Sequence, residues 1–312
     1  MTLPQFRPRS PTEIVDAAIQ LGRRHYPSLL VLSAIIAIPN VALGLVAQWL
    51  LPPAVSAGGE LGDAADVMLV FGVAAFSMAW TLVGFGALVA STSEAYVEGR
   101  TLEPMVALRA ALRRALRLVM SNFIAYALVM AVVTIGIMIV AIAAGLAAAA
   151  LGLGGSTPEA MGALIGVVVG VGMLVGMLAG GLLLGSRFVN ITAAIMLEGR
   201  GIMSAISRST ELTRGNAWRT AGVVLIMFVL YAVAFLSSWA IFLLVVRDVN
   251  LSANVAGVLV LALYPFLGAM LTLLYYDLRI RREGYDLELM ARALGPTGEV
   301  VPGAAPPAGA SA

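Results

Sequence analysis

The most regular of the side chains that could do chemistry stand in a repeated triplet. Glu-Gly-Arg occurs at 98–100 and again at 198–200, and a further Glu-Gly pair occurs at 283–284. A carboxylate beside a guanidinium could serve acid–base catalysis. Gly is also the residue that most often ends a helix, because it adopts the left-handed backbone at no steric cost. We favour the structural role, in which each Glu-Gly pair is a turn between two helices.

The residue types that most enzymes use are scarce. The only histidine is His25, and the chain has no cysteine. One imidazole alone builds neither a metal site nor a catalytic triad, and no Walker loop, zinc pattern or Gly-x-Ser-x-Gly motif is present. We therefore expect a protein that is not an enzyme and that needs no metal and no cofactor.

A further group of charges lies near the C-terminal end. Four acids alternate there with three arginines, namely Asp277, Glu283, Asp286 and Glu288 with Arg279, Arg281 and Arg282. Such alternation is typical of a salt-bridged surface helix, which is our prediction. An enzyme of lipid metabolism would instead use such carboxylates at a membrane interface, and loss of a phosphodiesterase activity on mutating them would favour that alternative.

Hydrophobicity predicts the elements that carry these residues. The chain is 61% hydrophobic and 12% charged, with a mean hydropathy of +0.98, whereas soluble domains carry about 25% charged residues. Its apolar blocks reach the roughly 20 residues that a helix needs to cross a bilayer. We predict an all-α polytopic membrane bundle with interfacial amphipathic helices and six transmembrane helices, at 28–51, 66–92, 119–150, 160–186, 219–246 and 252–277.

Arginine is distributed unevenly between the two sides of these helices. All nineteen basic residues are Arg, and only Arg247 falls in a link on the second side. The positive-inside rule places the Arg-rich side, with both termini, in the cytoplasm. We therefore predict a multi-pass protein of the bacterial cytoplasmic (inner) membrane. We expect membrane lipids as partners, together with a second copy or another membrane protein, and no nucleic acid.

The Arg-rich stretches follow a repeated plan. Each odd-numbered span is preceded by an amphipathic segment, and the first segment opens with a capping box, Ser10-Pro11-Thr12-Glu13. We interpret the chain as three parallel two-helix units, at about 10–100, 101–200 and 201–292. They form one integral membrane domain, 1–294, and the Pro-, Gly- and Ala-rich tail at 295–312 is expected to be disordered.

The second amphipathic segment, over 105–118, has the most regular spacing. Its apolar residues recur at helical intervals: Met105, Leu108, Leu112, Leu116 and Val119. Its other face carries Arg109, Arg113, Arg114 and Arg117. We predict that these arginines contact anionic lipid headgroups while the apolar face lies in the acyl boundary, where each basic residue is worth ~1 kcal/mol. The alternative is that they only orient and anchor the chain.

Glycines recur every four residues in the fourth predicted span. They form two rows, Gly162, Gly166 and Gly170, then Gly172, Gly176 and Gly180. Small residues at this interval let helices pack closely in lipid, so we predict packing within the bundle or between subunits. A substrate path lined by backbone is the alternative. Pro39 and Pro265 lie inside the first and sixth spans, where proline is expected to kink the helix.

Three stretches on the Arg-rich side resemble a known family. They are FRPRSPTEIVDAAIQLGRRHYPSLL near the N-terminus, IMLEGRGIMSAISRSTELTRGNAWRTAGVVL from Ile195, and LLYYDLRIRREGYDLELMARAL from Leu273. They are similar to the bacterial glycerophosphoryl diester phosphodiesterase membrane domain. In the enzymes of that name, a soluble barrel with His and acidic metal ligands follows the membrane domain. The resemblance covers the membrane part, so we expect the catalytic barrel to be absent and carry over no activity.

Together these features predict a membrane scaffold or accessory module that contacts anionic lipids through Arg-rich amphipathic helices. Two alternatives stay open. A small-molecule carrier or channel would have a water-filled, polar-lined cavity between the units. A lipid-metabolism accessory to a phosphodiesterase would follow from the family resemblance.

Overall fold

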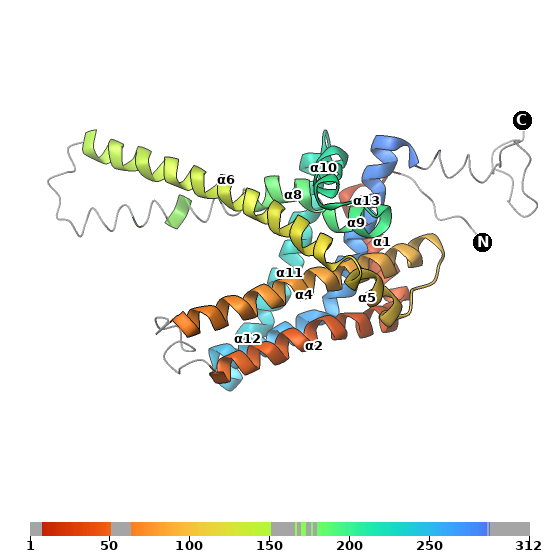
Figure 1. Cartoon of the computed structure of the whole chain (residues 1–312), viewed down its shortest axis with the longest axis horizontal. Helices are drawn as coiled ribbons and strands as arrows, with labels where there is room; N and C mark the ends of the chain where they lie inside the picture. Colours follow the sequence, from red (N-terminus) through yellow and green to blue (C-terminus); the bar gives the residue numbers. More distant parts are fainter. Residues whose placement is uncertain are drawn as a thin grey trace, which may run out of the picture.

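A computed structural model describes residues 8–50, 64–150, 166, 170–172, 176, 180–285 and 287. Within these ranges the chain is helical and contains no strand (Figure 1). Five helices are long and apolar enough to cross a membrane: Tyr26–Ala47, Ala64–Val97, Ala115–Ala143, Ala217–Val246 and Leu251–Glu283. The chain is therefore an all-helical membrane protein, and five of the six predicted spans coincide with these helices. The fourth, 160–186, lies largely outside the described residues, as does the tail at 295–312.

The N-terminal pair of helices follows the predicted signals. α1 (Pro11–Arg24) begins at the capping box, in which Ser10 Oγ accepts from Glu13 N at 3.2 Å and Glu13 accepts from Ser10 N at 2.6 Å. α2 (Tyr26–Leu50) contains Pro39, which cannot donate a backbone hydrogen bond. Near it, Trp80 Nε1 donates to the carbonyl of Ile36 at 3.0 Å. A neighbouring helix thus supplies a donor close to the proline.

The core lies where α2 meets α4 (Ala64–Val97) and α13 (Tyr264–Glu283). α4 approaches its neighbours closely, because Gly84 lies against Ile36 and Gly268 of α13 lies against Leu88. Between α4 and α13, the hydroxyls of Thr92 and Thr272 are buried and hydrogen-bonded to each other at 2.6 Å. These contacts set the spacing of the three helices.

The predicted amphipathic helix over 105–118 is wrong in one respect, because the chain turns within it. α5 (Pro104–Leu112) ends before Arg113, and the membrane-spanning helix α6 (Ala115–Ala150) begins two residues later. Ala107, Leu108 and Ala111 of α5 are buried against α4 and α2, so this side of the helix packs on protein. Met105, Leu112 and Leu116 of the predicted apolar face stay exposed. Burial of one side of α5 fixes the direction of that helix. The chain therefore turns at residues 113–114 before α6 begins in a different direction.

Short helices connect the spans in the second half of the chain. They are the π-helical turn η2 (Gly180–Leu184), α8 (Gly185–Phe188), α9 (Ile191–Glu198) and α10 (Ile202–Thr213). The stretches Leu182–Glu198 and Ile202–Thr213 are bent by 120° at a short break, a geometry of a broken span or a re-entrant loop. α11 (Ala217–Val246), α12 (Val249–Val260) and the 3₁₀ turn η3 (Leu261–Leu263) then lead to α13, which begins with Pro265 in its first turn.

Four short helices, α1, α5, α9 and α10, gather at one end of the molecule (Figure 1). Packing contacts join α1, α9 and α10 to α13, and α10 to α9, while α5 packs on α4 and α2. We call this region the Arg-rich end. The long helices α2, α4 and α11 run from it toward the opposite end, where α12 lies, while the second half of α6 extends beyond the other described helices.

Candidate functional site

The three Glu-Gly pairs end helices at the Arg-rich end, as predicted. Gly99, Gly199 and Gly284 have φ angles of 75°, 70° and 62°. These values lie in the left-handed region that favours glycine over residues with a side chain. Gly199 caps the end of α9 and Gly284 caps the end of α13. The backbone therefore confirms the turn role.

The side chains of the two full triplets form the same local bond in very different surroundings. Arg100 Nε donates to Glu98 Oε2 at 2.9 Å, and Arg200 Nε donates to Glu198 Oε2 at 2.9 Å. Glu98 is 47% exposed, whereas Glu198 is 12% exposed. The first triplet is thus a surface turn, while the second one faces into the protein.

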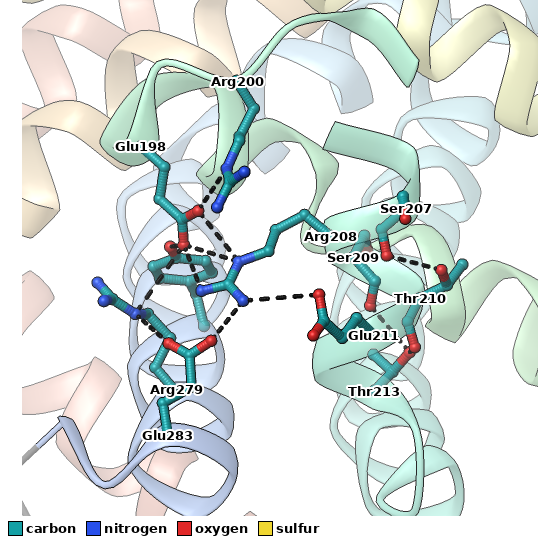
Figure 2. Close-up of polar contacts among 11 residues, drawn as sticks. Glu198, Arg200, Ser207, Arg208, Ser209, Thr210, Glu211, Thr213, Arg279 and Glu283 are labelled. Atoms are coloured by element: carbon teal, nitrogen blue, oxygen red, sulfur yellow. Dashed lines mark hydrogen bonds and ion pairs between the residues drawn. The ribbon is translucent and has the colours of Figure 1, made fainter. Parts of the chain in front are cut away.

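Glu198 is held by donors from three other elements (Figure 2). Arg208 of α10 donates through Nε to both carboxylate oxygens at 3.0 Å and through Nη2 to Oε1 at 2.9 Å. The hydroxyl of Tyr275 from α13 also donates to Oε1. Arg200 completes the set from the turn after α9. A fork of two parallel bonds to one carboxylate is the strongest geometry that arginine offers.

Arg208 also joins this carboxylate to the third Glu-Gly pair. It forms an ion pair with Glu283 of α13, and Arg279 Nε donates to Glu283 at 3.1 Å. Arg279 lies over the ring of Tyr285, 4.0 Å from its centroid. We call the connected set the glutamate–arginine network: Glu198, Arg200, Arg208, Tyr275, Arg279 and Glu283. It ties the ends of α9 and α13 together through α10.

Sequence reasoning missed Arg208, although its position carried a signal. Ala205, Ser209 and Leu212 are buried on α10, and Arg208 lies on the same helix face with 9% of its surface exposed. A charged residue on the apolar face of an amphipathic helix requires a partner. The partner could not be read from the pattern, because it lies across the fold.

A second buried carboxylate, Asp277, fixes the segment before α1. It is 2% exposed and accepts from the backbone N–H of Arg9 at 2.7 Å, from Arg219 Nε at 3.2 Å and from Arg281 Nε at 3.0 Å. Arg281 in turn donates to the carbonyl of Arg9 at 3.0 Å. The prediction of a surface helix is therefore wrong here, because this part of α13 is buried and two of the three donors lie outside α13. Asp286 and Glu288 lie outside the described residues.

A pocket of ≈ 620 Å³ opens beside the network, between α8, α10, the start of α11 and the end of α13. Three arginines line it, Arg187, Arg214 and Arg282, together with hydroxyls of α10. We call it the arginine pocket. Ser209 Oγ donates to the carbonyl of Arg187 at 2.7 Å, and this bond attaches α8 to α10 directly behind the pocket.

Comparison with known proteins places this chain in a family. Residues 73–277 match the family described as Domain of unknown function (DUF7847). The chain belongs to this family. No curated protein and no solved structure matches it. The matched range runs from α4 into α13, so the DUF7847 domain contains Glu198, Arg208 and Tyr275, and it contains the arginine pocket except for Arg282.

The four arginines predicted to contact lipid divide into two pairs in the DUF7847 domain. Arg109 and Arg113 are exposed on α5 and the turn after it. Arg114 donates to the carbonyl of Met196 and Arg117 to the carbonyl of Gly199 at 3.4 Å, both beside the α9–α10 break. The second pair thus bonds to the domain's own backbone.

The two glycine rows also differ in the DUF7847 domain. Gly172, Gly176 and Gly180 face α6, where a Cβ on Gly176 would lie 3.5 Å from Val133 and a Cβ on Gly172 would lie 3.8 Å from Val140. Added Cβ atoms on Gly166 and Gly170 would meet no described atom within 4 Å. Gly162 lies outside the described residues.

Proposed function

We propose that this DUF7847 protein is a scaffold or accessory module of the bacterial inner membrane, with its Arg-rich end and both termini in the cytoplasm. We propose further that exposed arginines at this end contact anionic lipids. The sequence supports the orientation, because all basic residues except Arg247 belong to the links and termini of the Arg-rich end.

The exposed corner between α5 and α6 carries the proposal. Neither Arg109 nor Arg113 has a side-chain hydrogen bond or ion pair with the described residues. Beside them, Leu112 and Leu116 are 45% and 73% exposed. Free guanidinium groups next to exposed aliphatic side chains suit the boundary between headgroups and acyl chains. We therefore assign the lipid contact to Arg109 and Arg113, since Arg114 and Arg117 bond to backbone carbonyls.

We also propose six spans in three two-helix units. Glycines with a left-handed backbone recur at the ends of the proposed units, at 99, 199 and 284. At the first two, the arginine after the glycine donates to the glutamate before it. The described residues within 166–176 are all helical, as the fourth span requires. An added Cβ on Gly166 or Gly170 would meet no described atom within 4 Å, so this row offers a packing face for a second copy or another membrane protein.

A carrier or channel is less well supported. A pocket of ≈ 340 Å³ lies between α2 and α4 among the spans, and Leu43, Met68, Val73 and Phe76 are among its apolar lining residues. A transport path for a polar solute needs polar side chains or backbone at that depth. The apolar lining of this pocket favours the scaffold over the carrier.

Lipid binding by single variants tests the proposal. Arg109→Gln and Arg113→Gln would each be purified in mild detergent, and bound phosphatidylglycerol and cardiolipin would be counted by native mass spectrometry. Arg100→Gln is the matched control, because Arg100 is exposed at the same end but paired with Glu98. We expect fewer anionic lipids on the first two variants and no change on the control. Equal retention by all three would refute the lipid contact.

A further inference from the structure

The arginine pocket brings three cationic side chains together from separate parts of the chain. Arg187 comes from α8, Arg214 follows α10, and Arg282 comes from the last turn of α13. All three are exposed, and within the described residues none of their guanidinium groups forms an ion pair or a side-chain hydrogen bond. Three like charges that converge in one pocket create a strong positive potential, which a bound anion would relieve.

The one acid among the lining residues is directed elsewhere. Glu211 lies 3.8 Å from Arg208 Nη1, on the side of the glutamate–arginine network (Figure 2). The Glu211 side chain is 64% exposed, so water screens its negative charge. The pocket therefore keeps a surplus of positive charge from Arg187, Arg214 and Arg282.

Side-chain bonds on the opposite face of α10 hold the walls of the pocket in place. Arg208 holds α10 to α13 through Glu283, and Ser209 holds it to α8 through the carbonyl of Arg187. Asn190, which follows α8, also donates its backbone N–H to Ser209 Oγ at 3.2 Å. One face of α10 thus anchors the elements that carry the arginines, while Ser207 and Thr210 face the pocket. A site held in place before binding loses less entropy when its ligand arrives.

The size and position of the pocket limit the class of ligand that it could bind. A volume of ≈ 620 Å³ is in the range of sites for small organic ligands, so it accepts a phosphate group together with the molecule that carries it. Ala217 lines the pocket, and the next residue, Trp218, is 77% exposed. An exposed tryptophan at the start of a span is typical of the headgroup depth of a membrane.

We infer that the arginine pocket is a binding site for a phosphate group, carried either by a lipid headgroup or by a small phosphorylated metabolite. Guanidinium groups bind phosphate oxygens through paired, charge-assisted hydrogen bonds. The site is separate from the lipid surface proposed at Arg109 and Arg113, because the two share no residue. Either assignment can therefore fail without the other.

The test uses the full chain and two sets of probes. Inorganic phosphate and glycerol 3-phosphate would be titrated by calorimetry onto the protein in neutral detergent. Phosphatidic acid would be titrated in phosphatidylcholine nanodiscs that hold the protein, with tryptophan fluorescence, to which Trp218 beside the pocket contributes, as the readout. Arg214→Gln combined with Arg282→Gln removes two guanidinium groups that have no ion-pair partner among the described residues. Arg109→Gln combined with Arg113→Gln is the matched control.

We expect the pocket variant to bind its probe at least about tenfold more weakly, because each lost guanidinium group removes charge-assisted hydrogen bonds to the phosphate oxygens. The control should bind like the unmodified protein. Loss of phosphate binding in detergent identifies a soluble ligand, and loss confined to nanodiscs identifies a lipid. If the double variant is unstable, Thr210→Glu places an acid in the pocket and should weaken binding likewise. Failure of every probe to bind, or unchanged affinity in the pocket variants, would overturn the inference.

Discussion

Neutralising the same glutamate in the two Glu-Gly-Arg triplets should have unequal effects on stability. Glu98→Gln and Glu198→Gln are the same chemical change at the same position of a helix-ending turn. In both, the arginine two residues later loses a charged acceptor at 2.9 Å. The difference lies in what else the carboxylate holds, because Glu198 also accepts from Arg208 and Tyr275.

The expected size of the effect follows from burial. Removing one partner of a buried ion pair costs about 3–5 kcal/mol, because the other charge is left uncompensated. Arg208 keeps its ion pair with Glu283 after Glu198→Gln, and the amide can still accept hydrogen bonds, so we expect a smaller loss of about 2–3 kcal/mol. Arg100 is 74% exposed and is rehydrated when Glu98 is neutralised, so Glu98→Gln should leave stability unchanged within error.

Thermal unfolding in a mild detergent measures the difference. A loss of 1 kcal/mol lowers the Tm of a domain of this size class by roughly 2–4 °C, so Glu198→Gln should lower Tm by about 4–12 °C. Arg208→Gln and the double variant complete a double-mutant cycle. We expect the double variant to be more stable than the sum of the two single changes predicts, because the two residues are bonded to each other.

Two outcomes would refute this reasoning. Equal Tm changes for Glu98→Gln and Glu198→Gln would mean that the buried pairing does not distinguish the two turns. Strict additivity in the cycle would mean that Glu198 and Arg208 do not stabilise one another.

Three further changes probe other parts of the Arg-rich end. Gly199→Ala puts a side chain on a left-handed backbone of φ 70° and should lower the free energy of unfolding by about 1–2 kcal/mol. Gly222→Ala, at an open position of α11, is the control and should be neutral or stabilising. Equal Tm values for the two variants would contradict this prediction. Asp277→Asn weakens three donor contacts and should make the segment before α1 more sensitive to trypsin at unchanged secondary structure; an unaltered digestion rate would argue against the anchor. Burial, with a smaller contribution from Arg24, lowers the pKa of His25 below its ordinary 6.5, so the unfolded chain binds the proton more readily and stability should fall as pH drops through 6.5. His25→Gln should reduce that fall, and an identical pH profile would exclude His25 as its source.

Local signals were sufficient to predict five of the spans and the helix-ending turns. Apolar length alone located five of the membrane-crossing helices, since a helix in lipid satisfies its own backbone hydrogen bonds. The capping box at Ser10 and the left-handed glycines at 99, 199 and 284 are also local, because each depends on the conformation of its own residue. Such features do not depend on how the helices pack against one another.

The candidate sites depended on tertiary contacts that the pattern does not contain. Arg208 and Glu198 are ten residues apart, but Tyr275 and Glu283 reach them from the last helix. The turn at Arg113 likewise depends on α5 packing against α4, and the regular apolar spacing over 105–118 contains no signal for that turn. The pocket arginines lie on α8, after α10 and at the end of α13, and only the folded arrangement shows that they converge.

The contact between Arg9 and Asp277 has a consequence for the order of synthesis. The two residues are 268 positions apart, and Asp277 holds the backbone of Arg9 while Arg219 and Arg281 surround the carboxylate. During translation Arg9 is synthesised near the start of the chain and the second half of α13 near its end. The N-terminal segment must therefore wait for nearly the whole chain to be translated before it can dock, so the Arg-rich end reaches its final form only after the spans between have been inserted.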